Sequence, residues 1–199
     1  FVAESSIAAF AYELRFTAHE IVLSSADDAG RRYGLISLAQ LLHGGRADRE
    51  SFKFPNFGTI ADQPRYDWRG CHLDVSRQFY PVADIMRLID ILAWNKLNIF
   101  HWHLTDDEAW RLEIKAYPAL TEIGARRGPD EVLMPQLGDG AEPRSGHYTQ
   151  DDVRRIVAHA ASLHIDVVPE IDIPGHSSAT LLSLPALVDG QEAPDSYRS

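Results

Sequence analysis

Three short apolar segments alternate with two amphipathic segments between residues 70 and 173, and this alternation constrains the fold more than any other feature. The apolar segments read GCHLDV, LNIFHWHL and IDVVPEIDI, and apolar residues recur at helical spacing in the segments between them, residues 81–96 and 149–164. The order strand, helix, strand, helix, strand is typical of a parallel sheet covered by helices. We therefore expect an α/β fold.

Polar residues follow each of the three expected strands directly, in the stretches DVSRQ, TDDEAWR and EIDIPGH. In a (β/α)8 barrel, the residues that carry the chemistry gather at the C-terminal ends of the strands. A complete barrel takes about 250 residues, more than remain here after residue 60. We therefore expect part of a (β/α)8 TIM barrel, namely its first three to four strands.

The first 60 residues show a different pattern. AYELRF alternates apolar and polar residues, as a half-buried strand does, and HEIVLSS indicates a second short strand. A helix is expected next, with Ser25 as its N-cap and Gly44 and Gly45 at its end. Residues 46–66 are polar and contain prolines, which is typical of a linker or domain junction. Strand, strand and helix together predict a small α+β unit.

Composition excludes several classes of protein. The formal net charge is −10 at pH 7, which argues against nucleic acid or an anionic membrane as the main partner. Cys71 is the one cysteine, so no internal disulfide is expected. No apolar run approaches the roughly 18 residues of a membrane-spanning helix. No signal peptide is visible, and the compartment is left open.

The polar residues after the first two strands are candidates for a binding site. Arg77 offers a fork of donors to sugar hydroxyls or carboxylates, and the alternative is a salt bridge at the barrel rim. Asp106 and Asp107 are adjacent carboxylates, of which one can face a site while the other binds backbone amides; a solvated turn is the alternative. Trp110 follows closely and is more typical of a core residue. Asp74 and Arg69 are assigned structural roles.

Histidines and further carboxylates complete the set of candidates. His101 and His103 lie two residues apart on a strand and so face the same side, which suits either a metal site or two core histidines. His176 follows the third strand in PEIDIPGHSSA, where two prolines and a glycine shape the backbone around Glu170 and Asp172. A histidine at this position suits a general acid or base, or a group that orients one.

These stretches together resemble glycoside hydrolase family 20, the β-N-acetylhexosaminidases. The resemblance rests on WRGCHLDVSRQFYPV, LNIFHWHLTDDEAWRLEI and YTQDDVRRIVAHAASLHIDVVPEIDIPGHSSA, in this order and at these separations. GRRYGLISLAQLL is similar to the end of the small α+β domain that precedes the barrel in the family. The resemblance implies that residues 1–60 are the C-terminal part of that accessory domain and that residues 61–199 begin the catalytic barrel.

The family removes terminal β-linked N-acetylglucosamine or N-acetylgalactosamine with retention, and the 2-acetamido oxygen of the substrate acts as the nucleophile. The resemblance implies that Arg77 holds the outer hydroxyls of the terminal sugar. It implies that Asp106 pairs with His176 to support the catalytic glutamate, with Asp107, Glu170, Asp172 and Trp110 as supporting candidates. No metal and no cofactor is implied, and the partners are GlcNAc- or GalNAc-containing oligosaccharides or glycoconjugates.

The sequence departs from the family in one large respect. The family's catalytic Asp–Glu pair stands in a Gly-Gly-Asp-Glu-like stretch after the fourth strand, and no such stretch occurs here. LVDGQEAPD contains Asp189 and Glu192, but neither the adjacent pairing nor the apolar strand before it, so it is given no role. We expect an N-terminal part of a longer enzyme, inactive alone, whose exposed sheet edges need the missing half of the barrel or an oligomer partner.

Two other functions are left open by the residues themselves. A metal-dependent barrel hydrolase would use His101, His103 and His176 as ligands. A non-catalytic sugar-binding module would use the same strand ends without turnover.

Overall fold

A computed structural model describes residues 1–187, apart from residues 5, 49 and 137–141. Asp189 and Glu192 lie outside these described residues. The chain divides into two compact units, Phe1–Arg69 and Gly70–Ser199. Within the described residues, no helix is long and apolar enough to cross a membrane.

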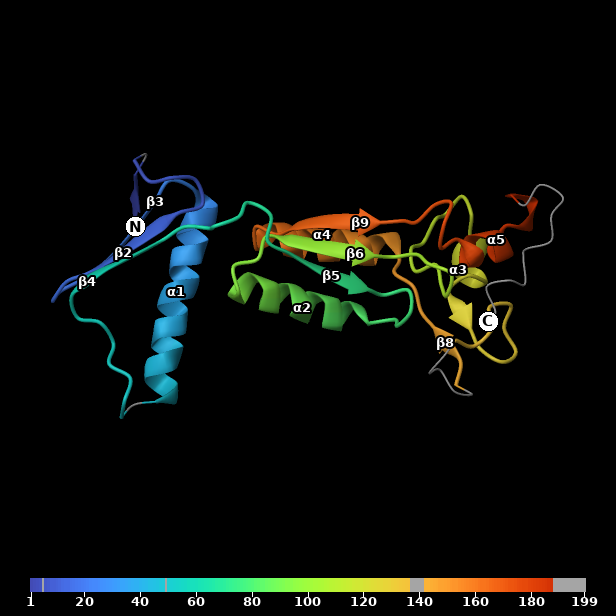
Figure 1. The fold of residues 1–199 in the computed structure, drawn as a ribbon, viewed down its shortest axis with the longest axis horizontal. Coiled ribbons are helices and arrows are strands. Elements are labelled where there is room, and N and C mark those ends of the chain that lie inside the picture. Colours follow the sequence, from blue (N-terminus) through green and yellow to red (C-terminus); the bar gives the residue numbers. More distant parts are fainter. Residues whose placement is uncertain (5, 49, 137–141, 188–199) are drawn as a thin grey trace. The chain divides into compact units, whose positions relative to one another are not determined.

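The first unit is a four-stranded sheet with one long helix (Figure 1). The sheet order is β1-β3-β2-β4, and β2 pairs antiparallel with both β3 and β4. Alternate residues of β2 face the core, and Leu14 is fully buried there. The elements are β1 (Val2–Ala3), β2 (Tyr12–Phe16), β3 (Ile21–Ser25), α1 (Asp28–Ala47) and β4 (Gly58–Asp62).

Strand β4 lies within residues 46–66, where the sequence predicts a linker or domain junction and no strand. It pairs with β2 over five residues, from Gly58 opposite Phe16 to Asp62 opposite Tyr12. The expected domain boundary between residues 60 and 61 therefore falls inside this strand. Along the chain, the first compact unit ends at Arg69 and the second begins at Gly70. The strand was missed because GTIAD carries little apolar alternation, and its pairing with β2 is a tertiary contact that local sequence does not report.

Helix α1 differs from its prediction at both ends. Its N-cap is Asp27, whose carboxylate accepts a hydrogen bond from the backbone amide of Gly30, and not Ser25, which ends β3. The helix also continues through Gly44 and Gly45 to Ala47. The ring of Phe52 packs against both glycines, where a Cβ would approach it to 3.2 Å. This contact stabilises a helical end that glycine alone would disfavour.

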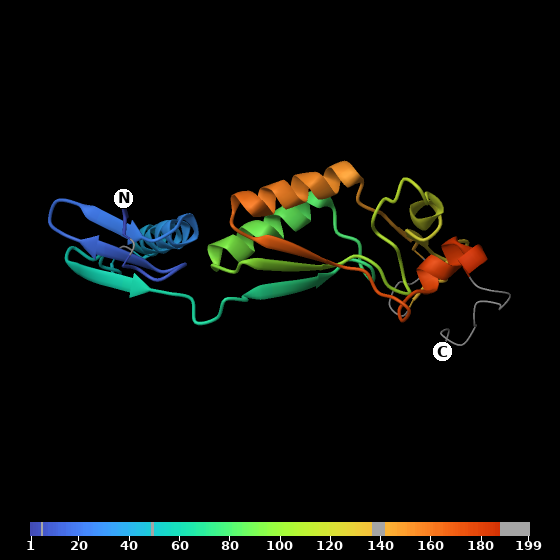
Figure 2. The same cartoon turned by 90° about the horizontal axis from the view of Figure 1, so that it is seen from above.

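The second unit contains the predicted parallel sheet. Its strands are β5 (Gly70–Asp74), β6 (Ile99–His103) and β9 (Asp166–Glu170), in the order β5-β6-β9. Helices α2 (Val82–Trp94) and α4 (Gln150–Ser162) cover the same face of this sheet (Figure 2). This is the start of a (β/α)8 barrel, with the helices outside and the opposite strand face inside.

The core of the second unit fills the space between sheet and helices. Phe100 and Trp102 of β6 point toward the helices and pack with Ile89 of α2 and Ile156 of α4, and all four are essentially inaccessible to solvent. Thr149 caps α4 with a reciprocal capping box involving Asp152. Because Phe100 and Trp102 face the helices, His101 and His103 face the barrel interior.

Short elements follow the C-terminal ends of the strands. They belong to the long connection between β6 and α4 and to the segment after β9. They are α3 (Ala119–Glu122), β7 (Arg126–Arg127), β8 (Arg144–Ser145), α5 (Ser178–Ser183) and a 3-10 helix (Pro185–Leu187).

Candidate active site

The ends of the three parallel strands lie at one level of the sheet. Asp74, His103 and Glu170 are the last residues of β5, β6 and β9, and they are direct neighbours in the strand register. The loops that follow carry Arg77, Asp106 and His176. The parallel register therefore delivers three chemically active segments to the same edge.

Arg77 binds three carboxylates at once. Its Nη1 lies 2.9 Å from Asp74 Oδ2 and 2.6 Å from Asp106 Oδ2, and its Nε lies 2.7 Å from Glu108 Oε2. Within the described residues, Nη2 makes no hydrogen bond, and the side chain is 43% exposed. Arg77 is thus held in place on one side and keeps donors for a ligand on the other.

Asp106 is the buried centre of this cluster. Its side chain is only 1% exposed, and its Oδ2 accepts contacts from both Arg77 and His103 Nε2, each at 2.6 Å. Its Oδ1 accepts the backbone amide of Asp107 at 2.7 Å and lies 3.1 Å from His176 Nδ1. A buried carboxylate is stable only when it is paired in this way.

His176 completes the predicted group of Arg77, Asp106 and His176. Its Nδ1 faces Asp106 and, at 3.4 Å, Asp107, while its side chain is 55% exposed. The backbone of His176 has φ 51°, a left-handed conformation that non-glycine residues seldom adopt. Such backbone strain persists where surrounding contacts hold it, and here it directs the imidazole toward two carboxylates.

His103 is the buried histidine of the site. Its Nε2 contacts Asp106, and its Nδ1 lies 3.0 Å from Glu170 Oε2. Burial lowers the pKa of His103, but the contacts with Asp106 and Glu170 outweigh burial, and the net shift of its pKa is upward. His101 lies two residues earlier and places Nε2 2.7 Å from the same oxygen of Glu170.

Asp107 forms hydrogen bonds with the segment that follows β9. Its Oδ1 accepts hydrogen bonds from the backbone amide of Ser178, at 3.0 Å, and from its hydroxyl, at 2.7 Å. Burial alone would raise the pKa of Asp107, but the hydrogen bonds from Ser178 and the nearby His176 lower it. Asp107 therefore ties the loop of the second strand to the loop of the third.

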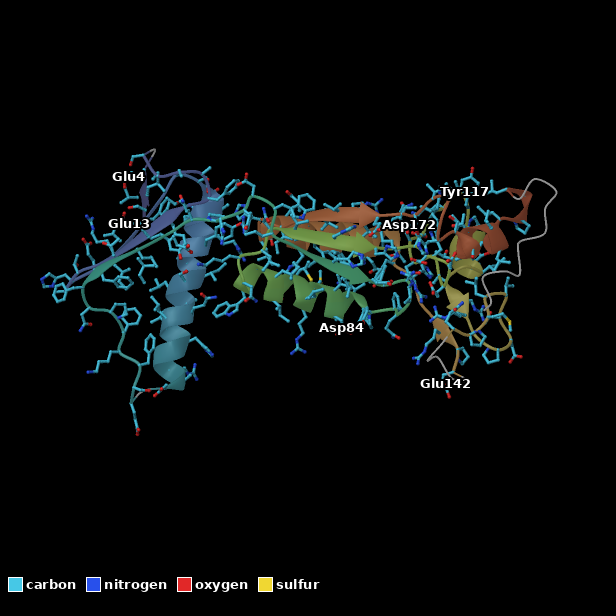
Figure 3. The ribbon with its side chains drawn as sticks, in the orientation of Figure 1. Glu4, Glu13, Asp84, Tyr117, Glu142 and Asp172 are labelled. Atoms are coloured by element: carbon cyan, nitrogen blue, oxygen red, sulfur yellow. The ribbon has the colours of Figure 1, made fainter. Side chains whose placement is uncertain are left out.

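The remaining candidates have different surroundings. Asp172 lies in the loop past β9 (Figure 3), and one of its carboxylate oxygens is within 4.8 Å of ligand atoms of His103 and Asp106. Its backbone amide donates to Thr105 Oγ1 at 3.2 Å. Trp110 is 8% exposed and packs with Leu120, Leu133 and Ala179 in a separate apolar cluster, as its expected core role implies.

Sequence reasoning missed Glu108 and gave Asp74 a purely structural role. Glu108 binds Arg77, and burial raises its pKa despite that cation, with Asp106 adding to the rise. Asp74 also holds Arg77, so its structural role lies within the candidate site itself. The signal for Asp74 was its position, because it ends a strand two residues after His72 on the same face.

Two buried arginines organise the backbone beneath the site. Arg111 is fully buried and donates to four carbonyl oxygens, those of Val75, Ser76, Ala125 and Gly146. Arg127, also buried, donates to the carbonyls of Arg77, at 2.9 Å, and Glu108, at 3.1 Å. Neither arginine was identified as a candidate, since sequence does not show which loop carbonyls lack partners.

The expected metal ligands His101, His103 and His176 are not gathered around one point in the described part of the chain. His176 contacts Asp106 and Asp107, whereas His101 contacts Glu170. Three other donor groups are close enough to hold an ion: His72 with His103 and Glu170, His103 with Asp106 and Asp172, and Asp106 with Asp107 and His176.

Comparison with known proteins identifies relatives along nearly the whole chain. Residues 66–199 match the family model described as glycosyl hydrolase family 20, catalytic domain. A beta-hexosaminidase of Vibrio furnissii is 44% identical over 189 residues, which are 95% of this chain and 30% of that protein. The N,N'-diacetylchitobiase of Vibrio harveyi is 39% identical over 90% of this chain and 20% of its own length.

Solved structures agree with these relatives. The GH20 exo beta-N-acetylglucosaminidase from Vibrio harveyi, in complex with N-acetylglucosamine, matches with a TM-score of 0.86 and 40% identity, over 98% of this chain and 30% of that one. The Streptomyces plicatus N-acetyl-beta-hexosaminidase matches with a TM-score of 0.73 and 36% identity, over 90% of this chain and 35% of that one. The chain thus spans about a third or less of these proteins.

Proposed function

Because the chain belongs to glycosyl hydrolase family 20, we propose that the complete protein is a retaining β-N-acetylhexosaminidase. Its substrates are terminal β-linked GlcNAc or GalNAc residues of oligosaccharides or glycoconjugates. Hydrolysis is substrate-assisted: the 2-acetamido oxygen of the sugar attacks the anomeric carbon in place of an enzyme carboxylate. The catalytic Asp–Glu pair of the family does not occur in this sequence, so this chain alone is proposed to be inactive.

One observation carries the proposal for this chain's own residues: Arg77 and His176 meet on the same buried carboxylate, Asp106, at 2.6 Å and 3.1 Å. Asp106 thereby fixes the orientation of both side chains. A binding group and a proton-handling group held by one carboxylate form a preorganised pair, which is what glycoside hydrolysis requires.

Arg77 binds the sugar in this proposal. Its Nε and Nη1 are occupied by carboxylates, so the guanidinium cannot rotate freely. Nη2 carries two further N–H donors on a half-exposed side chain, and neutral hydroxyls of a terminal sugar are suitable acceptors. The charge of Arg77 is already compensated by Asp74, Asp106 and Glu108, which suits a neutral ligand better than an anionic one.

His176 supports the catalytic glutamate in this proposal. When Nδ1 donates its proton to Asp106, Nε2 carries the lone pair and points away from that carboxylate. The half-exposed ring is then able to accept a proton or hydrogen bond from a carboxylic acid contributed by a later part of the barrel. Asp106 stabilises the charge that His176 acquires, as a carboxylate beside an imidazole does in other hydrolases.

The test uses the complete protein that contains this chain, with a nitrophenyl N-acetyl-β-glucosaminide as substrate. Asp106→Asn keeps the size of the side chain and removes its charge, and kcat should fall by about 10²-fold or more. Asp90→Asn on α2 provides the matched control, since Asp90 is exposed and contacts His159 at the surface. The proposal fails if the unaltered complete protein releases no nitrophenol or if Asp106→Asn retains full kcat.

A further inference from the structure

Three histidines surround one carboxylate oxygen in the barrel interior. Glu170 Oε2 lies 2.7 Å from His101 Nε2, 3.0 Å from His103 Nδ1 and 3.3 Å from His72 Nε2. The four side chains come from β5, β6 and β9, all of the strands of this sheet. No step of the proposed hydrolysis uses His72, His101 or Glu170.

The register of the sheet accounts for this cluster. His72 is the direct neighbour of His101 across β5 and β6, and His103 is the direct neighbour of Glu170 across β6 and β9. The two pairs occupy successive levels of the same face, because residues two apart on a strand point the same way. The cluster is therefore built on strands, which hold side chains more rigidly than loops do.

Hydrogen bonding does not account for the arrangement. A carboxylate oxygen has two lone pairs and cannot accept good hydrogen bonds from three imidazoles. Within the described residues, the buried atoms His103 Nδ1 and Glu170 Oε2 have no hydrogen-bond partner of good geometry, although they lie 3.0 Å apart. His103 is 4% exposed, so its unpartnered nitrogen points into the cluster from a buried position.

The opposite nitrogen of His103 is already fixed. Its Nε2 contacts Asp106 Oδ2 at 2.6 Å, and donation of the Nε2 proton to Asp106 leaves the Nδ1 lone pair directed at Glu170. Histidines that bind metals usually donate their other ring N–H to a carboxylate, which sets the tautomer and orients the ring. Asp106 thus supplies to His103 the support that a metal-binding histidine requires.

We propose that His72, His101, His103 and Glu170 form a binding site for a divalent transition-metal ion, Zn²⁺ above all. Three imidazole nitrogens and one carboxylate oxygen are ligands that Zn²⁺ accepts in tetrahedral geometry. Bonds of 2.0–2.1 Å place tetrahedral ligand atoms about 3.3–3.4 Å apart. Donor atoms of His72, His103 and Glu170 already lie within 4.8 Å of one another, and His101, whose Nε2 lies 2.7 Å from Glu170 Oε2, would turn toward them to supply the fourth ligand. Nitrogen-rich ligation disfavours Mg²⁺ and Ca²⁺.

The test is calorimetric titration of ZnCl₂ into the complete, chelator-treated protein. One equivalent of Zn²⁺ should bind, and His72→Leu should weaken binding by at least tenfold. Leucine suits this position because His72 takes no part in the proposed hydrolysis and lies on a strand. His19→Leu is the matched control, since His19 is exposed in the first unit, away from these strands in sequence, and should leave binding unchanged.

Two further measurements keep the proposal open to refutation if His72→Leu folds poorly. Co²⁺ in place of Zn²⁺ should give the visible absorption of a tetrahedral site, and His101→Ala should abolish it, with thermal melting to verify that each variant is folded. Mg²⁺ should not bind. Failure of Zn²⁺ to bind, or equal binding to the His72→Leu and unaltered proteins, overturns the proposal. Because binding is measured without substrate, either outcome leaves the proposed hydrolysis untouched.

Discussion

The guanidinium of Arg77 lies 2.6 Å from the carboxylate of Asp106, which is almost inaccessible to solvent, although Arg77 itself is 43% exposed. One partner of the pair is therefore part of the protein interior and the other reaches the surface. A buried charge depends strongly on its partner, because an unpaired carboxylate inside a protein is costly. Under the proposed function, the pair therefore links the stability of the barrel mouth to the binding of the sugar by Arg77.

Arg77→Lys is expected to raise KM at least tenfold in the complete protein while lowering kcat less. Lysine keeps the charge but has one ammonium group, which cannot contact Asp74, Asp106 and Glu108 while presenting a further donor to the sugar. Steady-state kinetics with a nitrophenyl N-acetyl-β-glucosaminide measures both constants. Arg154→Lys on the exposed face of α4 is the control. An unchanged KM would exclude a binding role for the guanidinium.

Glu108→Gln is expected to leave the free energy of unfolding at pH 7 unchanged or higher. Burial raises the pKa of Glu108, so the folded protein favours the protonated form. The stability of the unaltered protein then falls as pH rises from the unfolded value of about 4.3 through the folded pKa. The neutral amide of the variant does not titrate, so the variant is spared this loss. Urea unfolding at pH 4 and pH 7 measures the difference, and a marked destabilisation at pH 7 contradicts it.

Asp107→Asn is expected to have the opposite pH dependence. The pKa of Asp107 is lowered in the folded protein, so its charge contributes stability above the unfolded pKa of about 3.9. That contribution is lost as pH falls through the folded pKa. The unaltered protein should therefore be more stable than the variant at pH 6, and the two should converge in acid. A difference that persists at the lowest pH would show that shape, and not charge, matters here.

Arg111→Met is expected to destabilise the second unit by at least about 3 kcal/mol. The variant leaves three buried carbonyl groups and one partly buried carbonyl group without their donor, and each unsatisfied buried group costs about 1–3 kcal/mol. Chemical denaturation measures the loss. Arg154→Met removes an exposed arginine with an acidic neighbour and should change stability by no more than about 0.5 kcal/mol. Equal effects of the two substitutions would argue against a role for the buried hydrogen bonds.

Sequence patterns predicted the parallel sheet because each of its strands can be recognised locally. Each of its five-residue strands contains apolar residues, and the helices between them carry an apolar stripe. Strand β4 was missed because the evidence for it is its partner strand β2, which lies more than 40 residues earlier in the chain. The end of α1 was misplaced for a related reason: Phe52, beyond the helix, covers Gly44 and Gly45.

Those residues of the candidate site that directly follow a strand could be predicted from the sequence. Arg77, Asp106 and His176 each follow a different strand, and the parallel register brings them together. Glu108 was missed because a third acidic residue after two aspartates is usual in a solvated turn. The cluster of Glu170 with three histidines could not be predicted either, since only the register shows that His72 is the neighbour of His101.

Arg127 holds the loops of the first two strands by their main-chain oxygens, at Arg77 and at Glu108. Every amino acid supplies the same oxygen, so an exchange of either side chain leaves this attachment in place. The path of both loops should therefore survive substitution at these two positions. Under the proposed function, an enzyme engineer could vary residue 108, and residue 77 where the new side chain still pairs with Asp106, to change which sugar the rim accepts without rebuilding the loops.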